Sequence, residues 1–334
     1  MITPLSVLDL FPVTRGATPS QAIHDSLTLA RRADELGYAR YWIAEHHNMP
    51  NIAASAPEVL IGHVAQITKR IRVGSGGIML PNHAPLRVLE IFRTLEALHP
   101  NRIDLGIGRA PGTDQVTSAA LRRSSRPDDV NERLAELVAF ASKGFPENHP
   151  FSDIEAMPND VALPPIWMLG STSAGASLAA ALGVGFAFAG HFSMGEVDAA
   201  VRTYRSRFEP SDTMKEPRLM MAVSVVCGET DAQAEDLALP LRVTFARMAT
   251  GEKGPFPSIE EAKNFHFTPD ALAVIERFGK GAVIGGPEKV RLGLEKIVKA
   301  TGADELMISS IIPIQTERVA SYERLAKVWG LESA

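Results

Sequence analysis

The fold is decided by a unit that is complete in residues 71–107, which read IRVGSGGIMLPNHAPLRVLEIFRTLEALHPNRIDLGI. Two short apolar runs, Ile71–Gly74 and Ile103–Ile107, flank a helical pattern at Pro85–Leu98. Near-continuous apolar runs of this length are typical of strands that are buried on both faces. A strand, a helix and a second strand in this order predict two parallel strands joined by a crossover helix.

The same alternation runs along the whole chain. Eight β-rich runs are found, at Leu5–Leu10, Tyr41–Ala44, Ile71–Gly74, Ile103–Ile107, Ile166–Leu169, Phe186–Ala189, Leu219–Cys227 and Glu305–Ile311. Helical patterns lie between them, at Ser20–Leu36, Pro57–Thr68, Pro85–Leu98, Asn131–Ser142, Ser173–Leu182, Glu196–Phe208, Asp231–Ala246, Pro287–Ala300 and Glu317–Trp329. Eight units of similar size favour a single α/β domain over residues 1–334, a closed (β/α)8 TIM barrel, over the alternative of an open doubly wound sheet.

Two segments exceed the minimal barrel, and we interpret them as insertions after the fourth and seventh strands. Pro111–Asp129 is polar and follows the fourth strand, and Thr250–Lys280 separates the helix after the seventh strand from the eighth strand. The glycines and prolines of Thr250–Phe267 favour irregular backbone. We expect both segments to cover the active face, the second as a mobile lid.

Composition narrows the function classes. The 334 residues are 45% hydrophobic, carry a formal net charge of −5 and contain one cysteine. The absence of a basic patch argues against nucleic-acid binding, and a lone cysteine argues against a disulfide framework or a thiolate metal site. No apolar run approaches the ~20 residues of a membrane span, and Met1–Pro4 lacks the pattern of a signal peptide. We expect a cytoplasmic protein without a metal.

In a barrel of this kind the site lies at the carboxyl ends of the strands. His46 follows the second strand, and a histidine can act as acid or base near neutral pH; a hydrogen-bonded structural role is the alternative. Gly76 and Gly77 follow the third strand, where glycine allows close approach to the backbone or simply a tight turn. Gly108 and Arg109 end the fourth strand. Arg109 suits a phosphate or planar anion, or a salt bridge at the barrel rim.

The fifth strand is followed by Gly170, Ser171 and Thr172, which lead into a helix. Small hydroxyl residues at a helix N-terminus offer donors to an anion, although plain capping is the common use of such residues. The run of hydroxyl residues beside a glycine favours a phosphate site.

Together these pieces resemble the bacterial luciferase-like monooxygenase family. The residues that carry the resemblance keep the order and spacing of that family from Leu8 to about Trp329, and they lie at 44–48, 74–81, 102–109, 170–171 and 284–288. The resemblance implies a (β/α)8 fold and a site for flavin mononucleotide (FMN), which would be used in its reduced form as a co-substrate.

The resemblance also implies roles for individual residues. His46 matches the active-site histidine, and Gly76-Gly77 matches a non-proline cis peptide under the flavin ring. Arg109 would contact the flavin phosphate beside Ser171 and Thr172, and Arg133 resembles a second phosphate arginine. His191 stands near the position of an aromatic residue that lies against the flavin. Gly108 departs from the luciferase subunit, which has a reactive cysteine there, and this weakens any inference about light emission.

We therefore expect a flavin-dependent monooxygenase that uses reduced FMN and oxygen on an organic substrate that the sequence does not identify. The alternatives are a flavin- or deazaflavin-dependent reductase and a non-catalytic flavin-binding protein. A sugar-phosphate isomerase or aldolase is disfavoured because Glu45 is the only glutamate or lysine that ends a predicted strand. No nicotinamide fingerprint is present, so a separate flavin reductase would supply the flavin. Small residues in Ile52–Ala56, with Gly62 and Ala65, predict a homodimer.

Overall fold

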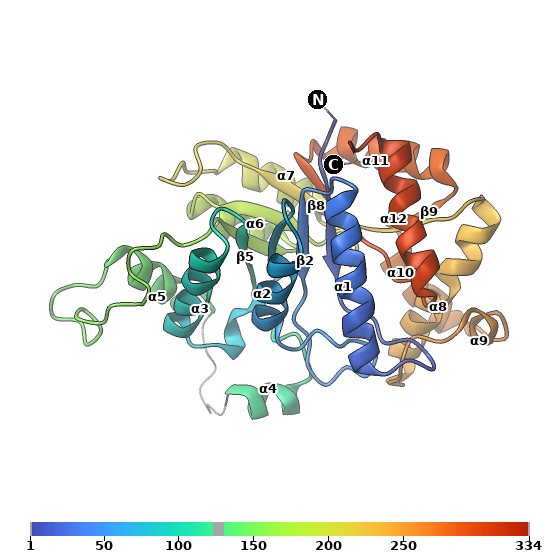
Figure 1. Cartoon of the computed structure of the whole chain (residues 1–334), viewed down its shortest axis with the longest axis horizontal. Helices are drawn as coiled ribbons and strands as arrows, with labels where there is room; N and C mark the ends of the chain where they lie inside the picture. Colours follow the sequence, from blue (N-terminus) through green and yellow to red (C-terminus); the bar gives the residue numbers. More distant parts are fainter. Residues whose placement is uncertain (1, 123–129, 333–334) are drawn as a thin grey trace.

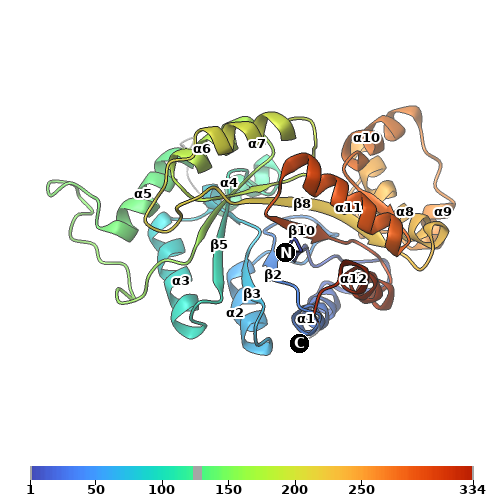
Figure 2. The ribbon, with the colours of Figure 1, turned by 90° about the horizontal axis from the view of Figure 1, so that it is seen from above.

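Eight parallel strands close into a barrel in the computed structural model of the chain, which describes residues 2–122 and 130–332 (Figures 1 and 2). Each strand pairs with the next, and β10 pairs with both β1 and β8 to close the ring. All eight predicted strands are confirmed as β1 (Leu5–Asp9), β2 (Arg40–Ile43), β3 (Arg72–Ser75), β5 (Ile103–Gly108), β6 (Ile166–Gly170), β7 (Gly185–Phe188), β8 (Leu219–Cys227) and β10 (Glu305–Ser309).

Helices surround the strands. They are α1 (Pro19–Glu35), α2 (Pro57–Ile67), α3 (Pro85–Leu98), α4 (Gln115–Arg122), α5 (Val130–Ser142), α6 (Ser173–Ala181), α7 (Val197–Ser206), α8 (Asp231–Thr250), α9 (Ile259–Lys263), α10 (Pro269–Gly279), α11 (Pro287–Thr301) and α12 (Gln315–Trp329), with a 3-10 turn η1 (Leu80–Asn82). α2, α3 and α11 begin on a proline. The N–H groups of the first turn of a helix have no partner within the helix, so a residue without an N–H is tolerated there. Gly37 and Gly183 follow α1 and α6 with φ of +83° and +60°, a backbone that favours glycine.

Six elements of the described residues were not predicted, among them the 3-10 turn η1. The two-residue strand β4 (Ile78–Met79) pairs with β5, and β9 (Val283–Gly285) pairs with the end of β8. α4 lies within the excursion at 111–129, whose residues 123–129 are outside the described part of the chain. α9 and α10 lie within 250–280.

The expectation of irregular backbone throughout Thr250–Phe267 is therefore wrong for α9. The Ser258 hydroxyl accepts from the Glu261 N–H while the Glu261 carboxylate accepts from the Ser258 N–H, which is a capping box. The segment is also tied to the loop after β1. Phe256 N–H donates to the Val13 carbonyl over 2.9 Å, and Arg15 N–H donates to the Phe256 carbonyl over 2.8 Å. The mobility of this lid stays a prediction.

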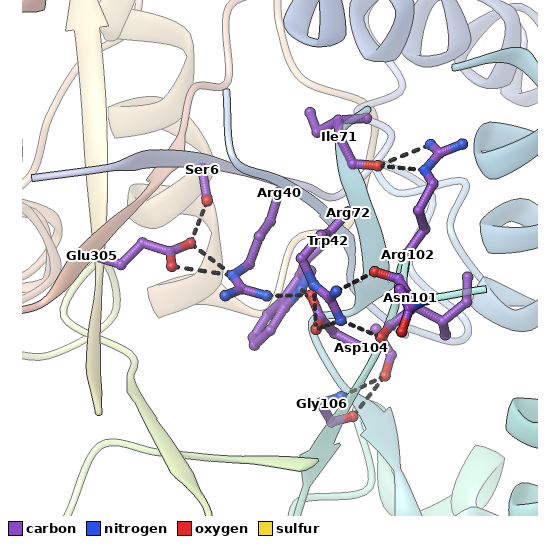
Figure 3. A network of polar contacts seen from close by, with 12 residues as sticks. Ser6, Arg40, Trp42, Ile71, Arg72, Asn101, Arg102, Asp104, Gly106 and Glu305 are labelled. Carbon is purple, nitrogen blue, oxygen red and sulfur yellow. Dashed lines mark hydrogen bonds and ion pairs between the residues drawn. The ribbon is translucent and has the colours of Figure 1, made fainter. Parts of the chain in front are cut away.

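The floor of the barrel is a network of ion pairs at the amino-terminal ends of four strands (Figure 3). The carboxylate of Asp104 in β5 is fully buried and accepts from Arg40 of β2 over 2.7 Å and from Arg72 of β3 over 2.6 Å. Arg40 also donates to Glu305 of β10 over 3.0 Å, and the hydroxyl of Ser6 in β1 donates to the same carboxylate. A buried charge is tolerated only when it is paired in this way.

The next layer inside the barrel is aromatic. Successive side chains of a strand alternate between its two faces, so Arg40, Trp42 and Ala44 all point into the barrel. The indole N–H of Trp42 donates to Asp104 over 3.2 Å, and its ring meets that of Trp167 edge-to-face with centroids 5.8 Å apart. Ala44, one layer further, lines a cavity. No helix of the described residues combines the length and apolarity that a membrane crossing needs.

Candidate active site

A cavity of about 440 Å³ opens at the carboxyl ends of the strands. Eight of the ten site residues expected from the sequence line it, namely His46, Gly76, Gly108, Arg109, Gly170, Ser171, Thr172 and His191. Residues that are 145 positions apart in the chain, such as His46 and His191, therefore share one enclosure. The remaining two, Gly77 and Arg133, are not part of the lining.

Glycines bring neighbouring strand ends unusually close together beneath this cavity. The peptide bond between Gly76 and Gly77 is cis, as expected. A Cβ atom on Gly77 would lie 2.8 Å from the carbonyl oxygen of Gly106, and one on Gly106 would lie 2.0 Å from the carbonyl oxygen of Ser75. Both separations are shorter than real Cβ contacts, so only glycine fits these two positions. Beside them, Gly76 and Gly108 line the cavity and form a shelf of backbone without side chains that a planar group can approach.

Arg109 follows directly on Gly108, the last residue of β5. Its guanidinium is close to the start of α6, since a Cβ on Gly175 would lie 3.0 Å from Arg109 Nη2. Among the described residues it has no hydrogen-bond or ion-pair partner, and its buried Nε is unsatisfied. A partly buried cation with no counter-ion, at the rim of a cavity, is set to receive an anion.

The N-terminus of α6 adds donors beside Arg109. Thr172 is its N-cap residue, but its side chain makes no capping hydrogen bond, so plain capping does not account for it. Ser173 is occupied, because its N–H and hydroxyl both donate to the Glu196 carboxylate, over 3.1 and 3.3 Å. A carboxylate at this place shows that the helix end attracts negative charge. Ser171 and Thr172, which line the cavity, are the donors that remain next to Arg109.

Two neutral imidazoles face the cavity, from the loops that follow β2 and β7. Burial lowers the pKa of His46 to about 4, although the Glu45 charge opposes the shift. Burial, with the nearby His46, lowers the pKa of His191 to about 4. The Nδ1 atom of each ring is buried without a hydrogen-bond partner among the described residues. Both rings therefore hold a free nitrogen at neutral pH that can accept or donate a proton, according to the tautomer.

Sequence reasoning missed the role of Glu45, the residue that precedes His46. Its fully buried carboxylate accepts from the Met79 N–H over 2.7 Å, and it contacts Nε2 of both His47 and His83 at 2.9 Å. Asn82 Nδ2 donates to it over 3.3 Å. Glu45 thereby ties the loop that carries His46 to the loop that follows the glycine shelf. Its position at a predicted strand end was the only signal in the sequence.

Within this cluster Glu45 and His83 form an ion pair, and their pKa values shift in opposite directions. Burial alone would raise the pKa of Glu45, but the hydrogen bonds from His83, His47 and Met79 outweigh it and lower the pKa. Burial alone would lower the pKa of His83, but the hydrogen bond and charge of Glu45 outweigh it and raise the pKa. Arg133 belongs to the same region, where its guanidinium donates to the His83 carbonyl rather than facing the cavity. Its predicted role as a second phosphate arginine remains a prediction.

The arrangement suits a ligand that combines an anion with a planar ring. Arg109, Ser171 and Thr172 would receive the anion, and the shelf at Gly76 would receive the ring. His46 and His191 would then lie within the same cavity, ready to exchange a proton with a reacting group. Charged side chains other than Arg109 do not line this cavity in the described part of the chain.

Comparison of the sequence with known proteins identifies a family and several relatives. A family model described as luciferase-like monooxygenase matches residues 3–305. A luciferase-like monooxygenase of Escherichia coli (strain K12) is 40% identical over 320 residues, which are 95% of this chain and 94% of that protein. An N-acetyl-S-alkylcysteine monooxygenase of Bacillus subtilis (strain 168) is 32% identical over 329 residues, which are 96% of this chain and 97% of that protein.

Solved structures share the fold of this chain. Apo-MsnO8 is 38% identical and superimposes with a TM-score of 0.91; the alignment covers 99% of this chain and 100% of that chain. The oxygenating constituent of 3,6-diketocamphane monooxygenase from Pseudomonas putida, in complex with FMN, shares the fold at 17% identity, with a TM-score of 0.71 and 98% coverage of each chain. An F420-dependent secondary alcohol dehydrogenase shares it at 15% identity, with a TM-score of 0.68 and coverage of 98% of this chain and 99% of that chain.

The Glu45–His83 pair predicts a pH-dependent stability. A raised His83 pKa stabilises the fold below about 6.5, and this contribution is lost as the pH rises through the raised value; a lowered Glu45 pKa stabilises above about 4.5. The free energy of unfolding lost in His83→Gln should therefore be larger near pH 5.5 than near pH 8.5, as measured by urea denaturation. The exposed His63 of α2 provides the control variant, His63→Gln. A loss that is equal at both pH values would show that the pair is not ionised as described.

Proposed function

The chain belongs to the luciferase-like monooxygenase family, and on this premise we propose that it uses reduced FMN and molecular oxygen to oxygenate a small organic molecule. One observation carries the choice of FMN. Arg109 has no partner among the described residues, and it lies at the edge of a glycine shelf beside the start of α6, where the Thr172 side chain makes no capping hydrogen bond. Such a combination fits a phosphate joined to a planar ring.

Different residues of this chain would hold the phosphate and the ring of FMN. Arg109, with the donors of Ser171 and Thr172, would bind the phosphate, and the backbone at Gly76 would support the flavin ring. Met79 and Leu169, which also line the cavity, would exclude water around it. When bound, reduced FMN supplies the electrons for the reaction with oxygen, which is chemistry that no side chain here provides.

His46 is the residue that we propose for proton transfer. With a pKa of about 4 it is neutral at pH 7, so its ring can take a proton from a reacting group or return one. The backbone of His46 is held in place, because Glu45 and His47 on either side are bound to other loops and the backbone N–H of His46 donates to the Ala54 carbonyl over 3.0 Å. A ring on a held backbone, with an unpaired nitrogen, is suited to acid–base catalysis.

Two alternatives on the same fold are separable by experiment. A deazaflavin-dependent dehydrogenase would transfer hydride without oxygen, and a non-catalytic protein would only bind flavin. Oxygen consumption on adding reduced FMN, compared with anaerobic hydride transfer from a reduced deazaflavin, decides between them. We favour FMN because Arg109 and the start of α6 form a compact anion site at one edge of the cavity.

We further propose that the protein is a cytoplasmic homodimer that receives reduced flavin from a separate reductase. Of the small residues that suggested a dimer, Ala54 and Ala65 are buried within the chain and Gly62 faces Leu95 of α3, whereas Ser55 and Ala56 are exposed. The dimer therefore stays a prediction, and the buried residues of that set are not candidates for its interface. Exposed apolar side chains of α2 and α3, Val59 and Leu98, remain as candidates for the interface, at 67% and 66% exposure.

The dimer is tested by mass. Light scattering at micromolar concentration should give twice the chain mass, and Val59→Glu with Leu98→Glu should shift it toward one chain, because charges in an apolar interface are costly. A monomer mass for the unmodified protein would reject the proposal.

Arg109 is tested by comparing two flavins. Arg109→Ala should weaken FMN binding by about 1.5–3 kcal/mol for each charge-assisted hydrogen bond that is lost. Riboflavin, which lacks the phosphate, should bind the variant and the original protein about equally. Binding is measured by quenching of flavin fluorescence, with the exposed Arg87→Ala as the control. Equal losses for FMN and riboflavin would place Arg109 away from the phosphate.

His46 is tested by separating binding from turnover. His46→Ala should bind reduced FMN almost normally but lose about 10²–10⁴-fold in turnover, the usual range for acid–base catalysis. Stopped-flow oxidation of the bound reduced flavin and product yield are measured together, with His63→Ala as the control. An unchanged time course with unchanged yield would remove His46 from the mechanism. Lower stability and lower flavin affinity with normal turnover per bound flavin would show a structural role instead.

A further inference from the structure

The cavity has a second wall whose chemistry differs from that of the anion site. α8 presents Leu241, Thr244, Phe245 and Met248 to it, at a spacing that places them on one face of the helix. Figure 2 shows α6, which borders the anion site, and α8 on different sides of the strands. The polar and apolar parts of the cavity are therefore separate surfaces.

The contacts of α8 with the barrel include residues outside this apolar face. α8 packs on the barrel through other residues, Ala234, Leu237 and Ala238, which form a cluster with Val226 and Ile312. The hydroxyl of Thr244 is satisfied within the helix, since it donates to the Pro240 carbonyl over 3.0 Å. Met248, at the end of the strip, is 51% exposed. Large apolar side chains that face a cavity instead of the core mark a surface for an apolar ligand.

The same wall lacks any counter-ion for a charged ligand. Arg109 is the only formally charged group among the described lining residues at neutral pH, because His46 and His191 are uncharged there. The cations within and next to the strip are paired, Arg242 with Glu235 at 2.6 Å, Arg247 with Glu252 at 3.2 Å and Lys253 with Asp114 at 3.4 Å. Once a phosphate neutralises Arg109, a carboxylate buried against α8 would have no partner, which is strongly unfavourable.

We propose that the substrate is a neutral molecule whose apolar body lies against Leu241, Phe245 and Met248, with its oxidisable end toward His46 and His191. This inference rests on the proposed function, because it assigns Arg109 to the flavin phosphate. It separates this chain from a relative named for an N-acetylated cysteine, a compound that carries a carboxylate.

The proposed reaction balances for a neutral thioether as an example. One atom of molecular oxygen forms a bond to sulfur and gives the sulfoxide, while the bond between the two oxygen atoms breaks and the second atom leaves as water. Reduced FMN supplies the two electrons and the two protons of that water, and it ends as oxidised FMN. The thioether is thus oxidised by two electrons, reduced FMN by two more, and oxygen takes up all four.

The test compares neutral and charged probes of equal length. Binding of 1-alkanols from six to twelve carbons and of the matching carboxylates is measured by titration of the FMN-loaded protein, with FMN binding recorded in the same samples. We expect alkanols to bind at least about tenfold more tightly than carboxylates, with affinity rising about fourfold for each added methylene. Equal or tighter binding of carboxylates, or no binding of either series, would overturn the inference.

Two lysine variants test whether the substrate binds against α8. Leu241→Lys and the half-exposed Met248→Lys, which is the safer of the two for folding, should weaken alkanol binding and strengthen carboxylate binding. Val138→Lys on α5, also exposed, is the matched control. Unchanged preferences in both α8 variants would move the substrate elsewhere. If FMN itself fails to bind, the proposed function fails; if FMN binds but the probes show no preference, only the substrate assignment fails.

Discussion

The buried carboxylate of Asp104 is the interaction on which the positions of the site residues depend. It joins β5 to β2 and β3 through Arg40 and Arg72, and Arg40 extends the network to β10. Displacing any one of these strands would leave a buried charge without a partner, so their relative register is strongly constrained. The other ends of β2 and β5 lead to His46 and Arg109. The floor of the barrel thus fixes the distances across its mouth.

The polar groups named at the floor of the barrel are paired within the protein, whereas some of those at its mouth have no partner among the described residues. At the floor, the charges of Asp104, Arg40 and Glu305 are paired within the protein. At the mouth, Arg109, His46 and His191 each hold a buried nitrogen without a partner among the described residues. Polar groups left unsatisfied in a folded protein are expected where a ligand supplies the partner. This contrast supports a ligand site at the mouth more than the presence of the cavity alone does.

The sequence was sufficient for the barrel and for most of the cavity, because a strand buried on both faces is a continuous apolar run and the residues after it must lie at one rim. It was insufficient where partners are distant in the chain. Glu45 contacts His83, which is 38 residues away, and the two are brought together only by the pairing of β2 with β3. β4 is too short to give a pattern, and α9 was missed although Ser258 and Glu261 have the spacing of a capping box. Ala65 was predicted to lie at a dimer interface but is buried in the core of the chain, because small apolar residues look the same in the local sequence in both environments.

The central claim is that the unpaired arginine at the end of β5 receives the phosphate of a flavin. A crystal structure of the protein with bound FMN tests it most directly. We expect the phosphate within hydrogen-bond distance of Arg109 and of the Ser171–Thr172 segment, with the flavin ring on the backbone at Gly76. A phosphate bound at Arg133, or a flavin that leaves Arg109 without a partner, would contradict the account.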